Sequence, residues 1–239
     1  MKACIDFNDF TGLDPELFNL LKKNDTIFRE TDTFTKVLEN ANIIQLVHQI
    51  DAFCLSNLIY GYHYTRASRE SILKYGLLVR SGETIRNEFL SQYRHIFTQI
   101  ELNIIESEYL KFNTTQNKET RDNRIFFNFI NDYSGTDDLL GYFGGEQVYS
   151  PIRNYPSILY KLSKIGTPLI VKCKLNPNDL IPSIENQWGK TCVSSYYKKI
   201  NALIITSDQD LSQSMPVNPL DIEILNIKNK NRPAKIILP

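Results

Sequence analysis

The chain has 239 residues, of which 42% are hydrophobic and 23% are charged, a composition typical of folded globular proteins and not of disordered ones. Its 27 lysine and arginine residues equal its 27 aspartate and glutamate residues, so the formal net charge is zero. This balance argues against a broad basic surface that holds nucleic acid nonspecifically, while a local basic groove remains compatible with it.

The four cysteines are widely separated and form no Cys-x-x-Cys pair, which predicts reduced thiols and no metal site. The first residues include acidic side chains and no apolar signal segment, and no run approaches the roughly 18 apolar residues of a membrane span. We therefore expect a cytoplasmic protein without a membrane partner.

Helical patterns dominate the N-terminal part of the chain. Asp14 followed by proline is a favourable N-cap and first helical position. Apolar residues recur at helical spacing over 34–53. We expect residues 1–57 to form a helical extension and residues 58–239 to form the main domain.

The segment from Tyr60 to Leu77 carries the most informative pattern. It predicts a strand with the polar side chain of His63 near its end, followed by a tight connection. A helix should then begin after the N-cap Ser68 and end at Gly76. This unit presents the histidine at the end of a strand.

Residues 82–146 contain two patterns of low specificity and, after them, a second informative segment. An apolar stripe over 82–112 predicts one or two helices, and the polar residues 113–123 predict an exposed loop. The sequence Leu-Leu-Gly-Tyr-Phe-Gly-Gly-Glu at 139–146 then places two glycines directly before a carboxylate. Such glycines let a ligand approach the backbone closely, with Glu146 projecting towards it.

The remainder of the chain consists mainly of short β-rich segments bounded by Pro, Asn, Asp and Gly. Helices followed by strands, with one intervening helix at 158–164, favour an α+β fold over a doubly wound parallel sheet. The expected strands are 125–130, 168–175, 202–206 and 222–227.

The sequence Tyr-His-Tyr-Thr-Arg at 62–66, followed by Ile-Leu-x-x-Gly-Leu at 72–77, resembles the first motif of the ADP-ribosyltransferase superfamily, in the branch whose first core strand carries a histidine. The segment 216–225 resembles the closing hairpin of such domains. The resemblance spans roughly residues 58–228. It implies a fold of ADP-ribosyltransferase type, with a split, mostly antiparallel β-sheet after the N-terminal helices. It also implies transfer of ADP-ribose from NAD to a protein or nucleic acid. The protein would then be a toxin or anti-phage defence effector, which an antitoxin or regulatory protein would restrain.

The resemblance implies roles for some residues and leaves others open. The family's histidine, which binds the ribose on the adenosine side of NAD, would be His63, with Thr65 beside it and Tyr64 on the opposite face of the strand. The family also stacks an aromatic ring on nicotinamide, and the candidates are Phe127, Tyr142 and Phe143. The catalytic glutamate commonly opens a late strand, but residues 201–205 carry no carboxylate. Either Glu146 serves instead, or the domain has lost catalysis.

The chemistry of NAD indicates further candidates. Cleavage of the nicotinamide bond passes through an oxocarbenium-like ribose, which the carboxylate of Glu146 would stabilise. The phosphates require cationic or backbone N–H partners, which Arg66, Arg80, Gly144 and Gly145 would supply.

Two alternatives to a transferase remain open. An RNA 2′-phosphotransferase-like enzyme would need several arginines around one phosphate, whereas an inactive NAD-binding or interaction domain would explain the missing carboxylate. The choice of acceptor is expected to depend on the loops 113–123 and 183–195. Trp188, in a polar part of the second loop, would indicate a partner surface if it is exposed.

Overall fold

The computed structural model describes residues 2–112, 120–131, 136–202, 210–225 and 227. The N-terminal helices form where the sequence predicts them. The side chain of Asp14 accepts hydrogen bonds from the first backbone N–H groups of α1, and Asn40 does the same for α4. The elements of this part are β1 (Cys4–Ile5), α1 (Pro15–Lys23), α2 (Asp25–Glu30), α3 (Phe34–Val37) and α4 (Ala41–Ser56).

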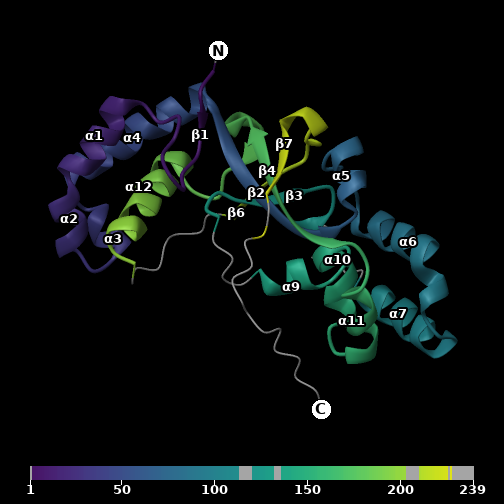
Figure 1. Cartoon of the computed structure of the whole chain (residues 1–239). Coiled ribbons are helices and arrows are strands. Elements are labelled where there is room, and N and C mark those ends of the chain that lie inside the picture. Colours follow the sequence, from purple (N-terminus) through teal and green to yellow (C-terminus); the bar gives the residue numbers. More distant parts are fainter. Residues whose placement is uncertain (1, 113–119, 132–135, 203–209, 226, 228–239) are drawn as a thin grey trace.

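The strand and helix that carry the first motif are confirmed. β2 (Leu58–Ala67) is the longest strand among the described residues and runs through the middle of the molecule (Figure 1). Ser68 caps α5 (Arg69–Tyr75) by accepting from the N–H of Ser71, and Gly76 ends that helix.

Gly76 has φ 76° and ψ −158°, a region that is open only to glycine. A Cβ at this position would lie 1.9 Å from the carbonyl oxygen of Val217. We expect Gly76→Ala to lower the free energy of unfolding by at least about 2 kcal/mol, because strain and backbone overlap add. Urea denaturation measures the loss. Gly141→Ala is the control, since its Cβ would meet no atom within 4 Å, and an equal loss in both variants would contradict the explanation.

The region 82–112 consists of two helices joined by a 3-10 turn: α6 (Gly82–Tyr93), η1 (Arg94–Ile96) and α7 (Gln99–Phe112). Most of the predicted loop 113–123 lies outside the described residues. The predicted helix at 158–164 is present and begins two residues earlier. The elements that follow α7 and precede β4 are β3 (Ile125–Asn128), α9 (Asp137–Gly141), α10 (Gly145–Tyr149), η2 (Ser150–Ile152) and α11 (Pro156–Leu162).

The strands form one open, mostly antiparallel sheet of seven strands in the order β5-β6-β3-β2-β4-β7, with β1 parallel to β2. The α+β class is therefore confirmed. β4 pairs with β2 over nine residue pairs, whereas β3 pairs with it only at Tyr62 and Asn128. The remaining elements are β4 (Thr167–Leu175), η3 (Pro177–Asp179), β5 (Leu180–Ile181), α12 (Gln187–Ile200), β6 (Asp210–Gln213), η4 (Pro219–Asp221) and β7 (Ile222–Leu225).

Two expectations about the last strands have different outcomes. The strand predicted at 202–206 lies, except for Ala202, outside the described residues. The closing hairpin predicted at 216–225 is wrong, because the consecutive strands β6 and β7 are not neighbours: β6 pairs with β3 and β5, and β7 pairs with β4. The connection between them crosses β3, β2 and β4 and so is not a hairpin turn.

The helices form two groups, one on each side of the strands in Figure 1. Helices α1–α4 and α12 share a large apolar core with the sheet, while α6, α7, α10 and α11 surround a second one. Residues from both sides of the proposed boundary at residue 57 contribute to the first core, so the division into an extension and a domain stays a prediction.

The interpretation of Trp188 as part of a polar loop is wrong. Trp188 lies in the first turn of α12, is 3% exposed and packs edge-on against Phe129. Asp51, which belongs to α4, accepts hydrogen bonds from the N–H groups of Trp188 and Gly189 and so caps α12 from another helix. Trp188 is therefore part of the core, and most of the predicted acceptor loop 183–195 is helix.

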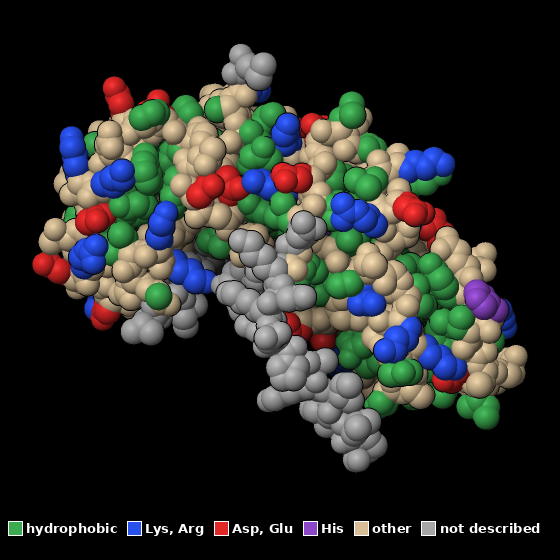
Figure 2. All heavy atoms as spheres, viewed as in Figure 1, with side chains coloured by type: hydrophobic (Ala, Val, Ile, Leu, Met, Phe, Trp, Pro, Cys, Tyr) green, Lys and Arg blue, Asp and Glu red, His purple; other side chains and the backbone are tan. Residues whose placement is uncertain are grey.

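All four cysteines are free thiols, and three of them are buried. Basic and acidic side chains are interspersed over the face in Figure 2, in keeping with the equal numbers of each. Among the described residues, no helix combines the length and apolar character needed to cross a bilayer.

Candidate functional site

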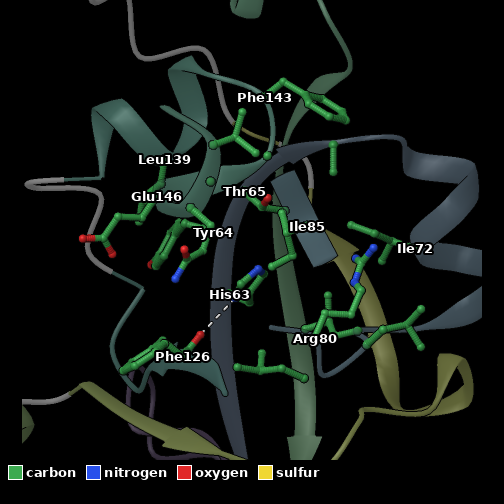
Figure 3. A pocket seen from close by; sticks show the side chains of 18 of the residues that line it. His63, Tyr64, Thr65, Ile72, Arg80, Ile85, Phe126, Leu139, Phe143 and Glu146 are labelled. Carbon is green, nitrogen blue, oxygen red and sulfur yellow. Dashed lines mark hydrogen bonds between the residues drawn. The ribbon is translucent and has the colours of Figure 1, made fainter. Parts of the chain in front are cut away.

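A cleft of about 550 Å³ opens beside β2, between β3, the segment from α5 to α6, and the segment from α9 to α10. This volume lies within the range of small-molecule sites. His63 lies at the centre of the view in Figure 3, with Arg80 on one side and Glu146 on the other. The predicted site residues that line the cleft are His63, Tyr64, Thr65, Arg80, Phe127, Phe143, Gly144, Gly145 and Glu146.

His63 is held in one orientation by its neighbours on β3. Its Nδ1–H donates to the carbonyl oxygen of Phe126 at 3.0 Å, and its ring packs edge-on against Phe127 at 6.2 Å. Because the carbonyl can only accept, the neutral ring carries its proton on Nδ1 and its lone pair on Nε2. Burial lowers the pKa of His63, and the bond to the carbonyl only partly opposes this effect. The neutral imidazole thus presents Nε2 as an acceptor, with no partner among the described residues.

Thr65 and Tyr64 occupy opposite faces of β2, as strand geometry requires. Thr65 is buried and lines the cleft with His63, two residues away on the same face. The ring of Tyr64 packs in a small apolar cluster, and its hydroxyl donates to Asn131 Oδ1 at 3.2 Å. Tyr64 is therefore a buried residue on the opposite face of β2 that also borders the cleft.

The two glycines are required by the turn that enters α10. Gly144 has φ 81°, its N–H donates to the carbonyl oxygen of Arg66 at 3.1 Å, and a Cβ would overlap Val148. Gly145 has φ 63°, but a Cβ there would meet no atom within 4 Å. Gly144 is therefore fixed by packing, whereas Gly145 leaves open space in front of the backbone.

Glu146 lies at the rim of the cleft, in the first turn of α10, and its carboxylate points away from His63 (Figure 3). It forms an ion pair with Arg121, whose guanidinium also lies 5.3 Å from the centre of the Phe126 ring. Both side chains of the pair are more than one third exposed. Glu146 can reach a ligand at the centre of the cleft only by parting from Arg121.

The structure distinguishes among the three aromatic candidates. Phe143 lines the cleft and packs against Tyr93 at 4.9 Å, and Phe127 borders it beside His63. Tyr142 is not brought to the cleft: its ring packs against Tyr149 beside the second core. Phe143, which is partly exposed, therefore remains as a candidate ring platform, whereas the ring of Phe127 is 1% exposed and belongs to the core.

Of the two arginines predicted to bind phosphate, one lines the cleft and the other does not. Arg80 lines the cleft and forms an ion pair with Glu88, while its Nε is buried without a partner among the described residues. Arg66 is not brought to the cleft, because its guanidinium donates to the carbonyl oxygens of Ile165 at 2.8 Å and Leu140 at 3.5 Å. Burial lowers the pKa of Arg66. Of this pair, only Arg80 is placed to meet a ligand.

The cleft also contains polar residues that sequence reasoning did not single out, namely Arg121, Arg124 and Asp210. Asp210 opens β6, so a carboxylate does begin a late strand, but not at 201–205. The short sequence of β6 has no apolar alternation that would have marked it as a strand. For Arg124, the sequence signal is its place directly before β3, in phase with Phe126 and Asn128.

We compared the chain with known proteins in three ways. No family model, no curated protein and no solved structure matches it. The cleft itself is therefore the feature of the molecule that bears on function.

Proposed function

We propose that this protein is an NAD-dependent ADP-ribosyltransferase that modifies an intracellular macromolecule. The observation that carries the proposal is the convergence of the segments 60–66 and 139–146 on one cleft, with His63 and Thr65 inside it and Glu146 at its rim. A neutral imidazole, aromatic rings and a carboxylate around a cavity of this size suit cleavage of the nicotinamide bond of NAD.

In the proposed reaction, the bond between ribose C1′ and the nicotinamide nitrogen breaks, and its electron pair neutralises the pyridinium ring. The positive charge that develops on the ribose is stabilised by the carboxylate of Glu146 through a ribose hydroxyl. An acceptor nucleophile then bonds to C1′ and loses its proton. Nε2 of His63 accepts a hydrogen bond from a hydroxyl of the second ribose, which it can do only while the ring is neutral.

The test is release of nicotinamide from NAD by the purified protein, with and without a mixture of cellular protein, DNA and RNA, together with transfer of label from adenine-labelled NAD. We expect release by the wild type and its loss in His63→Ala. His48→Ala is the control, because His48 is exposed on α4, away from the cleft. Binding of NAD without release under any condition would favour the inactive domain, and absence of both binding and release would overturn the proposal.

A second candidate is an RNA 2′-phosphotransferase-like enzyme, which the presence of Arg80, Arg121 and Arg124 at one cleft favours. Several guanidinium groups around one site suit recognition of a phosphate. Two of these arginines are already paired with glutamates, which makes this candidate the weaker one. It predicts that a 2′-phosphorylated RNA loses its phosphate when NAD is present. RNA without that phosphate should not react with NAD.

A further inference from the structure

One face of β3 presents three residues of different chemistry to the cleft. Arg124 directly precedes the strand, and Phe126 and Asn128 lie within it; all three line the cleft. They alternate with Ile125 and Phe127, which also border the cleft but are buried in the core. Because successive side chains of a strand point to opposite faces, the guanidinium, the ring and the amide share the outward face.

The guanidinium of Arg124 has no hydrogen bond or ion pair with any described residue, unlike the neighbouring arginines. The backbone N–H of Asn123 donates to the carbonyl oxygen of Arg80 at 3.1 Å, which holds the two arginine-bearing segments side by side. The buried Nε of Arg80 also lacks a partner among the described residues. A buried N–H without an acceptor is unfavourable, so the Arg80 side chain is not fully satisfied by its ion pair with Glu88.

The ring that follows this cation on the strand is partly exposed, with the guanidinium of Arg121 5.3 Å from its centre. Phe126 is 37% exposed, which is unusual for a phenylalanine in a central strand of a sheet. At the next outward position, Asn128 uses its Oδ1 to accept from the N–H of Ile130 at 3.0 Å, so its NH₂ group is the part that remains for a ligand. The backbone carbonyl of Phe126 accepts from His63, but Asn128 pairs with Tyr62, so the side chains of this face and that of His63 lie on opposite faces of the sheet.

We propose that the outward face of β3 binds a single-stranded nucleic acid, with a phosphate on Arg124, a base stacked on Phe126 and a base edge on Asn128. Cations alternating with exposed aromatic rings are the usual means of holding single strands. A protein acceptor would offer no phosphate for Arg124. The role of this nucleic acid as the ADP-ribose acceptor rests on the proposed function, but its binding to β3 does not.

The test is fluorescence anisotropy with labelled oligothymidylate and oligouridylate of about 12 nucleotides, in the absence of NAD and at two salt concentrations. We expect salt-sensitive binding by the wild type and binding about tenfold weaker in Arg124→Gln and in Phe126→Ser. Arg153→Gln, which changes an exposed arginine outside the cleft, should bind as the wild type does. Urea denaturation of each variant checks that the fold is retained.

The possible outcomes test nucleic-acid binding independently of the proposed reaction. No binding of either oligonucleotide by the wild type, or equal binding by all variants, would overturn the proposal. NAD is titrated into the same samples: weaker NAD binding by Arg124→Gln with unchanged oligonucleotide binding would assign the phosphate to NAD and overturn it too. Oligonucleotide binding without nicotinamide release would support the site and reject its role as acceptor.

Discussion

Glu146→Gln is expected to lower the rate of nicotinamide release by about 100-fold or more, because an amide cannot stabilise the positive charge on the ribose. The substitution keeps the shape of the side chain, and an amide oxygen can still accept a hydrogen bond from Arg121. Binding of NAD should therefore change by no more than about threefold, since the lost interaction belongs to the transition state. Single-turnover measurement of release beside calorimetric titration of NAD separates these two effects.

The matched control is Glu106→Gln. Glu106 also forms an ion pair with an arginine, Arg94 at 3.3 Å, and is exposed to a similar degree, but it lies on α7 outside the cleft. Asp210→Asn is the informative companion, because Asp210 opens a late strand and lines the same cleft. Full activity in Glu146→Gln combined with loss in Asp210→Asn would show that the wrong carboxylate has been assigned.

Asp6→Ala is expected to destabilise the protein by about 3 kcal/mol, because it removes one partner of a buried ion pair. Asp6 is 4% exposed; its Oδ2 accepts from the hydroxyl of Tyr62 at 2.6 Å and lies 2.7 Å from Nζ of Lys172. The Lys172 side chain is only 19% exposed, so it would lose its counter-ion in a poorly hydrated position. Urea denaturation at neutral pH measures the change, and a loss below about 1 kcal/mol would show that water replaces the carboxylate.

The ion pair of Asp6 and Lys172 also makes the stability of the protein depend on pH in the acid range. Burial alone would raise the pKa of Asp6, but hydrogen bonds from Lys172, Tyr62 and Asn8 outweigh it and leave that pKa below its usual value. The contribution of Asp6 is therefore fully present above about pH 4, the usual carboxyl pKa, and is lost as the pH falls through the lower folded value. The wild type should lose more stability on acidification than Asp6→Ala does.

Asp32→Ala is the control for both measurements. Asp32 also pairs with a lysine, Lys36 at 2.9 Å, but both side chains are more than half exposed. Solvent screens such pairs, so the variant should unfold as the wild type does at neutral pH. A loss as large as that of Asp6→Ala would mean that burial is not the reason for the expected effect.

The first motif was predictable because its determinants are local. The side chain of Ser68 satisfies an N–H three residues away, and Gly76 ends the helix through its own backbone angles. The alternation of β2 placed Thr65 beside His63 for the same reason. Predicting these contacts requires only the residues next to them in the sequence.

The composition of the cleft was only partly predictable. Glycines before a carboxylate indicated a site at 144–146, but the pairing of Glu146 with Arg121 joins residues separated by 25 positions. Trp188 illustrates the opposite error: its polar neighbours suggested a loop, yet Asp51 of α4 caps α12, and the ring is buried against Phe129. Local polarity did not reveal either contact.

The sequence by itself determined the α+β class, the capped helices and the strand that presents His63, because hydrogen bonds and side-chain periodicity within a few residues specify them. Only the tertiary structure decided the strand order, the exclusion of Arg66 and Tyr142 from the cleft, and its lining by Arg124 and Asp210. These features depend on contacts between residues far apart in the chain, where several arrangements bury the same apolar residues and only the packing of the whole selects one.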